Sequence, residues 1–72
     1  MGKFVDSYGS LVEDRCKILI ESNYNYEFLN GREASVEWDA EKGMYKYSVS
    51  FNNHNHTSDF HGIHKFKLIS NP

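Results

Sequence analysis

The residues best suited to chemistry are the four histidines, which all fall within HNHTSDFHGIH, residues 54 to 64. Imidazole is a common ligand of zinc and other transition metals, so His54, His56, His61 and His64 could in principle surround a metal ion. Structural zinc sites usually include cysteine, however, and these histidines are surrounded by asparagine, threonine and serine. The pattern favours an ordinary polar loop, and we predict no metal site and no other cofactor.

A pH response is the other chemistry that this histidine cluster could provide. Free imidazole changes charge close to neutral pH, with an ordinary pKa of about 6.5. A cluster that works in this way would change stability or binding between about pH 7 and pH 5.5. The sequence alone does not decide between such a sensor, a metal site and a plain loop.

Catalysis has little support in the sequence. Ser58, Asp59 and His61 lie together in HTSDFH, but a catalytic triad needs side chains that converge from separate elements beside an oxyanion hole. Cys16, the only cysteine, falls on the inward side of an expected strand, where a thiol behaves as a small hydrophobic group. We therefore expect a protein without enzymatic activity.

Aromatic side chains give a stronger signal, for binding. Tyr24, Tyr26 and Phe28 alternate along SNYNYEF, where they either pack locally or face a partner, and Phe28 is the one that we expect to be buried. Trp38 ends an expected strand and is either a lid on the core or, if exposed, the best single hot spot. The predicted partner-binding residues are Tyr24, Asn25, Tyr26, Trp38, His54 and His56.

A nucleic-acid surface is the alternative. Lysines on the outward sides of the expected strands could contact phosphates while Tyr24 and Tyr26 stack on bases. Glu21, Glu33 and Glu37 share that outward face and would repel phosphate, and the formal net charge of the chain is -2. The candidate residues for this alternative are Lys17, Lys46, Lys65 and Lys67.

The elements that position these groups must belong to one small domain. A chain of 72 residues buries only about 60% of the surface that its unfolded form exposes, but 39% hydrophobic residues suffice for a compact core. A single cysteine suits a reducing compartment, so we expect a cytoplasmic location. No apolar run approaches the roughly 18 residues of a membrane span, and the N-terminal residues do not resemble a signal peptide.

Alternating apolar and polar residues predict β-strands. In RCKILIES, residues 15 to 22, Cys16, Ile18 and Ile20 alternate with mostly polar neighbours. The other predicted strands are REASVEW (32–38), MYKYSVSF (44–51) and KFKLI (65–69). The predicted connections are a projecting loop (22–31), a hairpin turn (39–43), a polar loop (52–58) and a tight turn at Gly62.

These elements predict an all-β fold, a small SH3-like five-stranded antiparallel barrel over residues 15–72. An OB-fold is the second choice, because it usually needs more residues and a helix. Residues 1–14 form a short N-terminal extension, for which the sequence does not choose among a strand, a short helix and a mobile arm.

The segments CKILIESNYNYEFLNGREASV, YKYSVSF and TSDF resemble the SH3-like barrels of the photosystem I extrinsic E subunit and of the ferredoxin-thioredoxin reductase variable chain. KOW-type nucleic-acid modules and small prophage proteins of this fold are similar in layout. The chain departs from the E subunit at Asn25, Lys46 and Ser50, where that family has tryptophan, proline and arginine. Loss of the arginine weakens any expectation of docking to acidic ferredoxin.

The resemblance implies a noncatalytic domain that works by holding a partner. We therefore predict a binding module that docks onto a partner protein as an accessory or regulatory subunit, through the loop of residues 22–31 with help from the loop that holds His54 and His56. The small size and the richness in asparagine also suit a phage-encoded protein. The alternative is a KOW-like nucleic-acid-binding domain.

Overall fold

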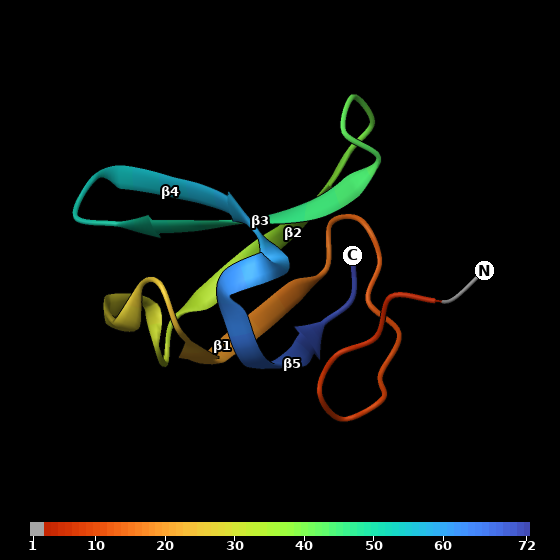
Figure 1. Cartoon of the computed structure of the whole chain (residues 1–72), viewed down its shortest axis with the longest axis horizontal. Helices are drawn as coiled ribbons and strands as arrows, with labels where there is room; N and C mark the ends of the chain where they lie inside the picture. The colour runs from red at the N-terminus through yellow and green to blue at the C-terminus, as the bar shows by residue number, and fades with distance from the viewer. Residues whose placement is uncertain (1–2) are drawn as a thin grey trace.

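The computed structural model describes residues 3–72, which form an almost entirely β-structured domain (Figure 1). Its five antiparallel strands lie in one sheet in the order β4-β3-β2-β1-β5, and two 3-10 helices, η1 and η2, interrupt the connections. The elements are β1 (Lys17–Asn23), η1 (Glu27–Leu29), β2 (Glu33–Asp39), β3 (Met44–Phe51), β4 (His54–Asp59), η2 (Phe60–Gly62) and β5 (Ile63–Ser70).

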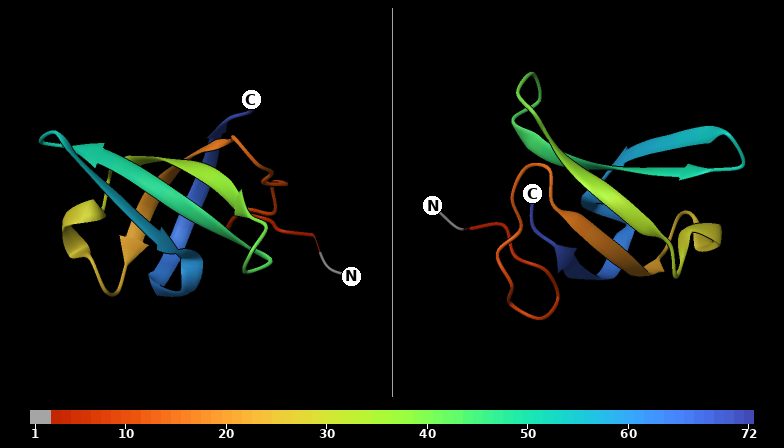
Figure 2. Two further views of the ribbon diagram at one scale, coloured as in Figure 1. Left: turned by 90° about the horizontal axis from the view of Figure 1, so that it is seen from above. Right: turned by 180° about the vertical axis from the view of Figure 1, so that it is seen from behind.

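The sheet is open, with β4 and β5 at its two edges. Figure 2 shows the strong twist that makes the β3–β4 hairpin cross the β1–β5 pair, and η2 carries the chain from one to the other. The prediction of an all-β fold with five antiparallel strands is confirmed. The hydrogen-bonded sheet does not close into the predicted barrel.

Burial follows the alternation predicted for the first three strands except at Trp38, which the pattern places on the inward side with Ala34 and Val36 but which is exposed. Cys16, Ile18 and Ile20 have no exposed surface, and Val36 and Tyr47 lie behind the same face of the sheet. Burying an aliphatic side chain of this size contributes about 1.5–3 kcal/mol, so this face dominates the stability of the domain. The buried core consists of Val12, Cys16, Ile18, Ile20, Leu29, Ala34, Val36, Tyr47, Val49 and Phe66.

The prediction of a polar loop over residues 52–58 is wrong, because this segment turns back as β4 and pairs with β3. Asn52 and Asn53 form the two-residue turn, with φ of 47° and 62°. Asparagine tolerates these left-handed values, which the favoured hairpin turn requires. Across the pair, the hydroxyl oxygens of Ser48 and Thr57 lie 2.8 Å apart. Polar cross-strand contacts thus take the place of the apolar pattern that identifies the other strands.

The loop that follows β1 lies close against η2. Asp59 caps this helix by accepting a hydrogen bond of 3.0 Å from the N–H of His61. A Cβ atom at Gly62 would lie 2.5 Å from Nδ2 of Asn25, so glycine leaves room here for the loop that follows β1. The final strand begins at Ile63, earlier than predicted.

The segment before β1 docks along the outer edge of β5. Buried Asp6 accepts a hydrogen bond of 2.7 Å from the N–H of Leu68. Ser7 donates its N–H to the carbonyl of Phe66 and accepts the N–H of Phe66 with its hydroxyl oxygen. Residues 1 and 2 of the predicted extension lie outside the described residues. Between residues 3 and 72, no helix is both long enough and apolar enough to cross a membrane.

Candidate functional site

The structure divides the predicted partner-binding residues between two surfaces. Trp38 lies near the end of β2, beside the β2–β3 connection, whereas Tyr24, Asn25 and Tyr26 lie before the start of β2, at the other end of the sheet (Figure 1). The rings of Tyr26 and His56 do meet, with centroids 4.4 Å apart. The tyrosine loop and Trp38 therefore cannot act as one continuous contact.

The loop after β1 exposes Tyr24 most, at 70% of its surface. Its hydroxyl lies 2.8 Å from Nδ1 of His64, which ties the ring to β5. The prediction that Phe28 is buried is wrong, because Phe28 is 51% exposed and Leu29 takes the buried position in η1. Tyr26 is the partly buried member of the three aromatic residues.

Asn23, the last residue of β1, orders this loop. Its Oδ1 accepts the N–H groups of Asn25 and Tyr26 at 2.9 and 3.0 Å. Its Nδ2 donates a hydrogen bond of 3.0 Å to the hydroxyl of Tyr47, which is buried in the core. A buried amide with these partners holds the loop in one conformation.

The histidines do not converge. Among the described residues, no three histidine, cysteine, aspartate or glutamate side chains are placed to hold a metal ion. The ring of His56 packs between those of Tyr26 and Tyr47, and its Nε2 is buried without a hydrogen-bond partner. The other rings lie apart on the exposed surface: His54, His61 and His64.

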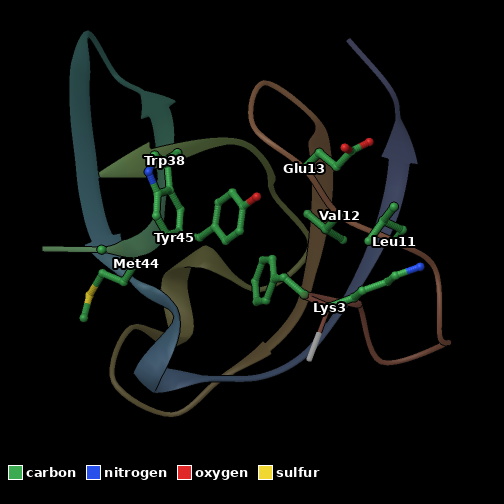
Figure 3. A pocket seen from close by; sticks show the side chains of 9 residues that line it. Lys3, Leu11, Val12, Glu13, Trp38, Met44 and Tyr45 are labelled. Carbon is green, nitrogen blue, oxygen red and sulfur yellow. The ribbon is translucent and has the colours of Figure 1, made fainter. Parts of the chain in front are cut away.

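A groove of about 680 Å³ opens between the N-terminal segment and the start of β3. In Figure 3 the rings of Trp38 and Tyr45 face Val12 and Leu11 across it. A hollow of about 390 Å³ adjoins the groove on the side of η2. We call the two together the Trp38 groove, and its principal apolar residues are Phe4, Leu11, Trp38, Met44, Tyr45 and Phe60.

The Trp38 groove leaves large apolar side chains in contact with water. Trp38 is 47% exposed, Leu11 43% and Met44 42%. Single exposed apolar residues are common on proteins, but a group of them around a hollow is a feature of binding surfaces. A partner that filled this groove would remove these apolar side chains from water.

A row of aromatic rings forms the wall of the groove. The ring centroids of Trp38 and Tyr45 are 4.9 Å apart, and those of Tyr45 and Phe4 are 4.7 Å apart. Phe4 in turn packs against Phe60 and Phe66, which belongs to the buried core. The wall is therefore anchored in the core, so binding here would require little ordering of side chains.

The backbone around Trp38 is held by the segment that precedes β1. The N–H of Trp38 donates a hydrogen bond of 3.0 Å to Oδ1 of Asp14, which replaces a neighbouring strand at this point of β2. Tyr45 pairs with Trp38 in the β2–β3 register. Sequence reasoning singled out Trp38 but missed Phe4 and Leu11, whose only signal is the pair of apolar dipeptides, Phe-Val and Leu-Val, in a polar segment.

The lysines of the predicted nucleic-acid surface fall into two groups, Lys17 with Lys46 and Lys65 with Lys67. The first group shares the outer face of the sheet with acidic residues, and Nζ of Lys46 lies 4.0 Å from Oε2 of Glu37. The second group lies over the ring of Tyr8, with Nζ atoms 5.4 and 5.9 Å from its centroid. Lys46, Lys65 and Lys67 thus each already have a partner within the domain.

No protein-family model matches this chain, and no curated protein or solved structure matches it either. The function must therefore be argued from the site itself.

Proposed function

We propose that this chain is a noncatalytic binding module with an SH3-like arrangement of strands, and that it docks onto a partner protein through the Trp38 groove. The observation that carries the proposal is the position of Trp38, half-exposed on the wall of an apolar groove. Tryptophan in a pocket that becomes desolvated is the residue type that most often dominates binding energy at protein interfaces.

The groove best suits an apolar segment of a partner chain. Tryptophan, tyrosine and methionine are enriched in interface cores, and aromatic-lined grooves are a common way of binding extended peptides. Lys3 and Glu13 lie at the same groove, and their opposite charges would orient a polar peptide backbone. An accessory or regulatory role in the cytoplasm belongs to the same proposal, because Cys16 is a free, buried thiol that suits a reducing compartment.

The loop that holds Tyr24 has weaker support as the docking surface. Its most exposed side chain already uses its hydroxyl on His64, and its conformation is explained by hydrogen bonds to Asn23. The KOW-like alternative also has weaker support, because Glu37 neighbours Lys46 on the outer face of the sheet. Phosphate binding at this face would require an acidic side chain to move away.

The experiment is capture of partners from a source-cell lysate by tagged wild-type protein, with and without nuclease, beside two variants. Trp38→Ala removes the ring from the groove, and Tyr24→Ala is the matched control because it removes an even more exposed ring at the other end of the sheet. We expect a stoichiometric protein partner that survives nuclease, is retained by Tyr24→Ala and is lost with Trp38→Ala.

Two outcomes would contradict this proposal. Loss of the partner with Tyr24→Ala but not with Trp38→Ala would move the docking surface to the tyrosine loop. Recovery of nucleic acid, with proteins that disappear after nuclease treatment and with binding that weakens steeply as salt rises, would favour the KOW-like function.

A further inference from the structure

The outer edge of β4 is unpaired. The Asn52-Asn53 turn makes Phe51 of β3 and His54 of β4 a hydrogen-bonded pair. Along two antiparallel strands, hydrogen-bonded pairs alternate with pairs that are not hydrogen-bonded. The N–H and C=O groups of Asn55, Thr57 and Asp59 therefore point away from β3. In the described part of the chain, no other strand lies beyond β4, which forms the free rim of the sheet in Figure 1.

The fold protects its other edge and leaves this one open. Along β5, Asp6 and Ser7 occupy backbone groups of Leu68 and Phe66. β4, by contrast, has the sequence HNHTSD, with no lysine, no proline and no break in its register with β3. Lysines, prolines and bulges are the devices by which proteins prevent edge strands from pairing, so this edge is competent to pair with another strand.

The edge is also complementary to itself. Suppose that two copies of β4 pair antiparallel about a two-fold axis at Thr57. Asn55 of each copy then lies opposite Asp59 of the other, and the backbone N–H and C=O groups that point away from β3 form the hydrogen bonds between the two copies. Asn55 uses its Oδ1 to accept a hydrogen bond from Ser50, which leaves its Nδ2 free to donate. Asp59 uses Oδ1 to accept the N–H of His61, which leaves its other carboxylate oxygen free to accept.

We infer that β4 pairs with β4 of a second copy of this chain, which joins two sheets into one continuous sheet in a symmetric dimer. The occupant is a second copy because this two-fold register places the free donor of Asn55 opposite the free acceptor of Asp59 twice, once at each end of the strand pair. The interface is a strand edge of small area, so the dimer forms at high protein concentration. This inference does not depend on the proposed role of the Trp38 groove.

The test is sedimentation velocity and light scattering of the full chain from about 10 μM to about 1 mM, a range that spans weak association. We expect the mass to rise with concentration from 8.4 kDa toward twice that value. Asn55→Asp places a carboxylate opposite Asp59 at both ends of the strand pair and should raise the dissociation constant at least about tenfold. The double variant Asn55→Asp with Asp59→Asn exchanges the two groups and should restore dimerisation.

These substitutions keep the contacts within each chain, because aspartate at 55 can still accept from Ser50 and asparagine at 59 can still cap η2. Trp38→Ala is the control and should dimerise as the wild type does. A wild-type protein that stays monomeric up to about 1 mM would overturn the inference. So would a dimer that survives Asn55→Asp, a double variant that stays monomeric, or a dimer that is lost with Trp38→Ala.

Discussion

The carboxylate of Asp6 accepts a hydrogen bond of 2.7 Å from the N–H of Leu68, which lies 62 residues further along the chain. The same carboxylate accepts the N–H groups of Tyr8 and Ser10 at 2.9 and 2.8 Å. Burial raises the pKa of Asp6, but these N–H donors outweigh it and hold the pKa below its ordinary value of 3.8. The ionised carboxylate therefore holds the N-terminal segment, and with it Phe4 and Leu11, against the sheet.

Replacing this carboxylate should weaken the fold in a pH-dependent way. We expect Asp6→Asn to lower the free energy of unfolding by about 1.5–3 kcal/mol at pH 7, because an amide nitrogen would face the N–H of Leu68. The stabilisation by ionised Asp6 is complete above the ordinary pKa of 3.8 and is lost as pH falls through the lower folded pKa, so the difference should shrink in acid. Urea unfolding at several pH values measures it, with Glu41→Gln at an exposed turn position as the control. A difference that does not change with pH would contradict this account.

Tyr47 should control stability at the opposite end of the pH range. Its burial raises the pKa of its hydroxyl above the ordinary value of 10.0, and the hydrogen bond from Asn23 offsets only part of this. The stabilisation that the protonated Tyr47 hydroxyl provides is therefore complete below pH 10 and is lost as pH rises through its folded pKa.

The variant Tyr47→Phe tests this. At pH 7 it should lose about 1–2 kcal/mol, because Nδ2 of Asn23 loses its acceptor inside the core. Above pH 10 its stability should fall less steeply with pH than that of the wild type. Thermal melts between pH 7 and 11 measure both effects, with Tyr24→Phe as the comparison variant at an exposed tyrosine. Equal slopes for Tyr47→Phe and the wild type would refute the assignment.

Sequence patterns could predict much of this fold because its central strands each have one buried face. Tyr47 and Val49 in β3 alternate with polar residues, Ile18 and Ile20 in β1 do so apart from Leu19 between them, and the structure buries all four as expected. β4 could not be found in this way, since polar side chains occupy both of its faces. Its one usable signal was Asn52-Asn53, because asparagine is favoured where a two-residue hairpin turn requires positive φ.

The candidate site was less predictable, because it depends on a segment without periodicity. Trp38 stood out by residue type alone, but its neighbours Phe4 and Leu11 are brought to it by the hydrogen bonds of Asp6 rather than by a strand. No spacing rule relates an irregular N-terminal segment to the end of β2.

Trp38 and Tyr45 should differ in what they contribute to folding. Trp38 is half-exposed, so we expect Trp38→Ala to cost about 1 kcal/mol or less, whereas Tyr45→Ala should cost about 3 kcal/mol because its ring packs on Phe4 at 4.7 Å. Chemical denaturation followed by circular dichroism measures both values. A Trp38→Ala protein that is as unstable as Tyr45→Ala would mean that Trp38 serves the core rather than a partner.

Glycine should be required at position 62 because a larger side chain would collide with Asn25, and not because the backbone there needs a conformation that favours glycine. Its added Cβ would lie 2.5 Å from Nδ2 of Asn25, so we expect Gly62→Ala to destabilise the protein by about 1–2 kcal/mol unless the amide moves. Removing that amide with Asn25→Ala should relieve the clash, so the double variant should be more stable than Gly62→Ala alone. Denaturation of the two single variants and the double variant forms a double-mutant cycle. Additive effects in this cycle would show that Gly62 matters for another reason.

A substitution at His56 should stabilise the protein, because the ring provides packing while its Nε2 is buried without a hydrogen-bond partner. Phenylalanine has a similar shape, keeps the ring contact with Tyr26 and removes the buried nitrogen, so His56→Phe should raise the free energy of unfolding by about 1 kcal/mol. The matched control is His54→Phe at an exposed position of the same strand, where no gain is expected. Urea unfolding at pH 7 compares the two variants. A loss of stability with His56→Phe would show that the imidazole makes a polar contact in solution, and the histidine cluster would again become a candidate for chemistry.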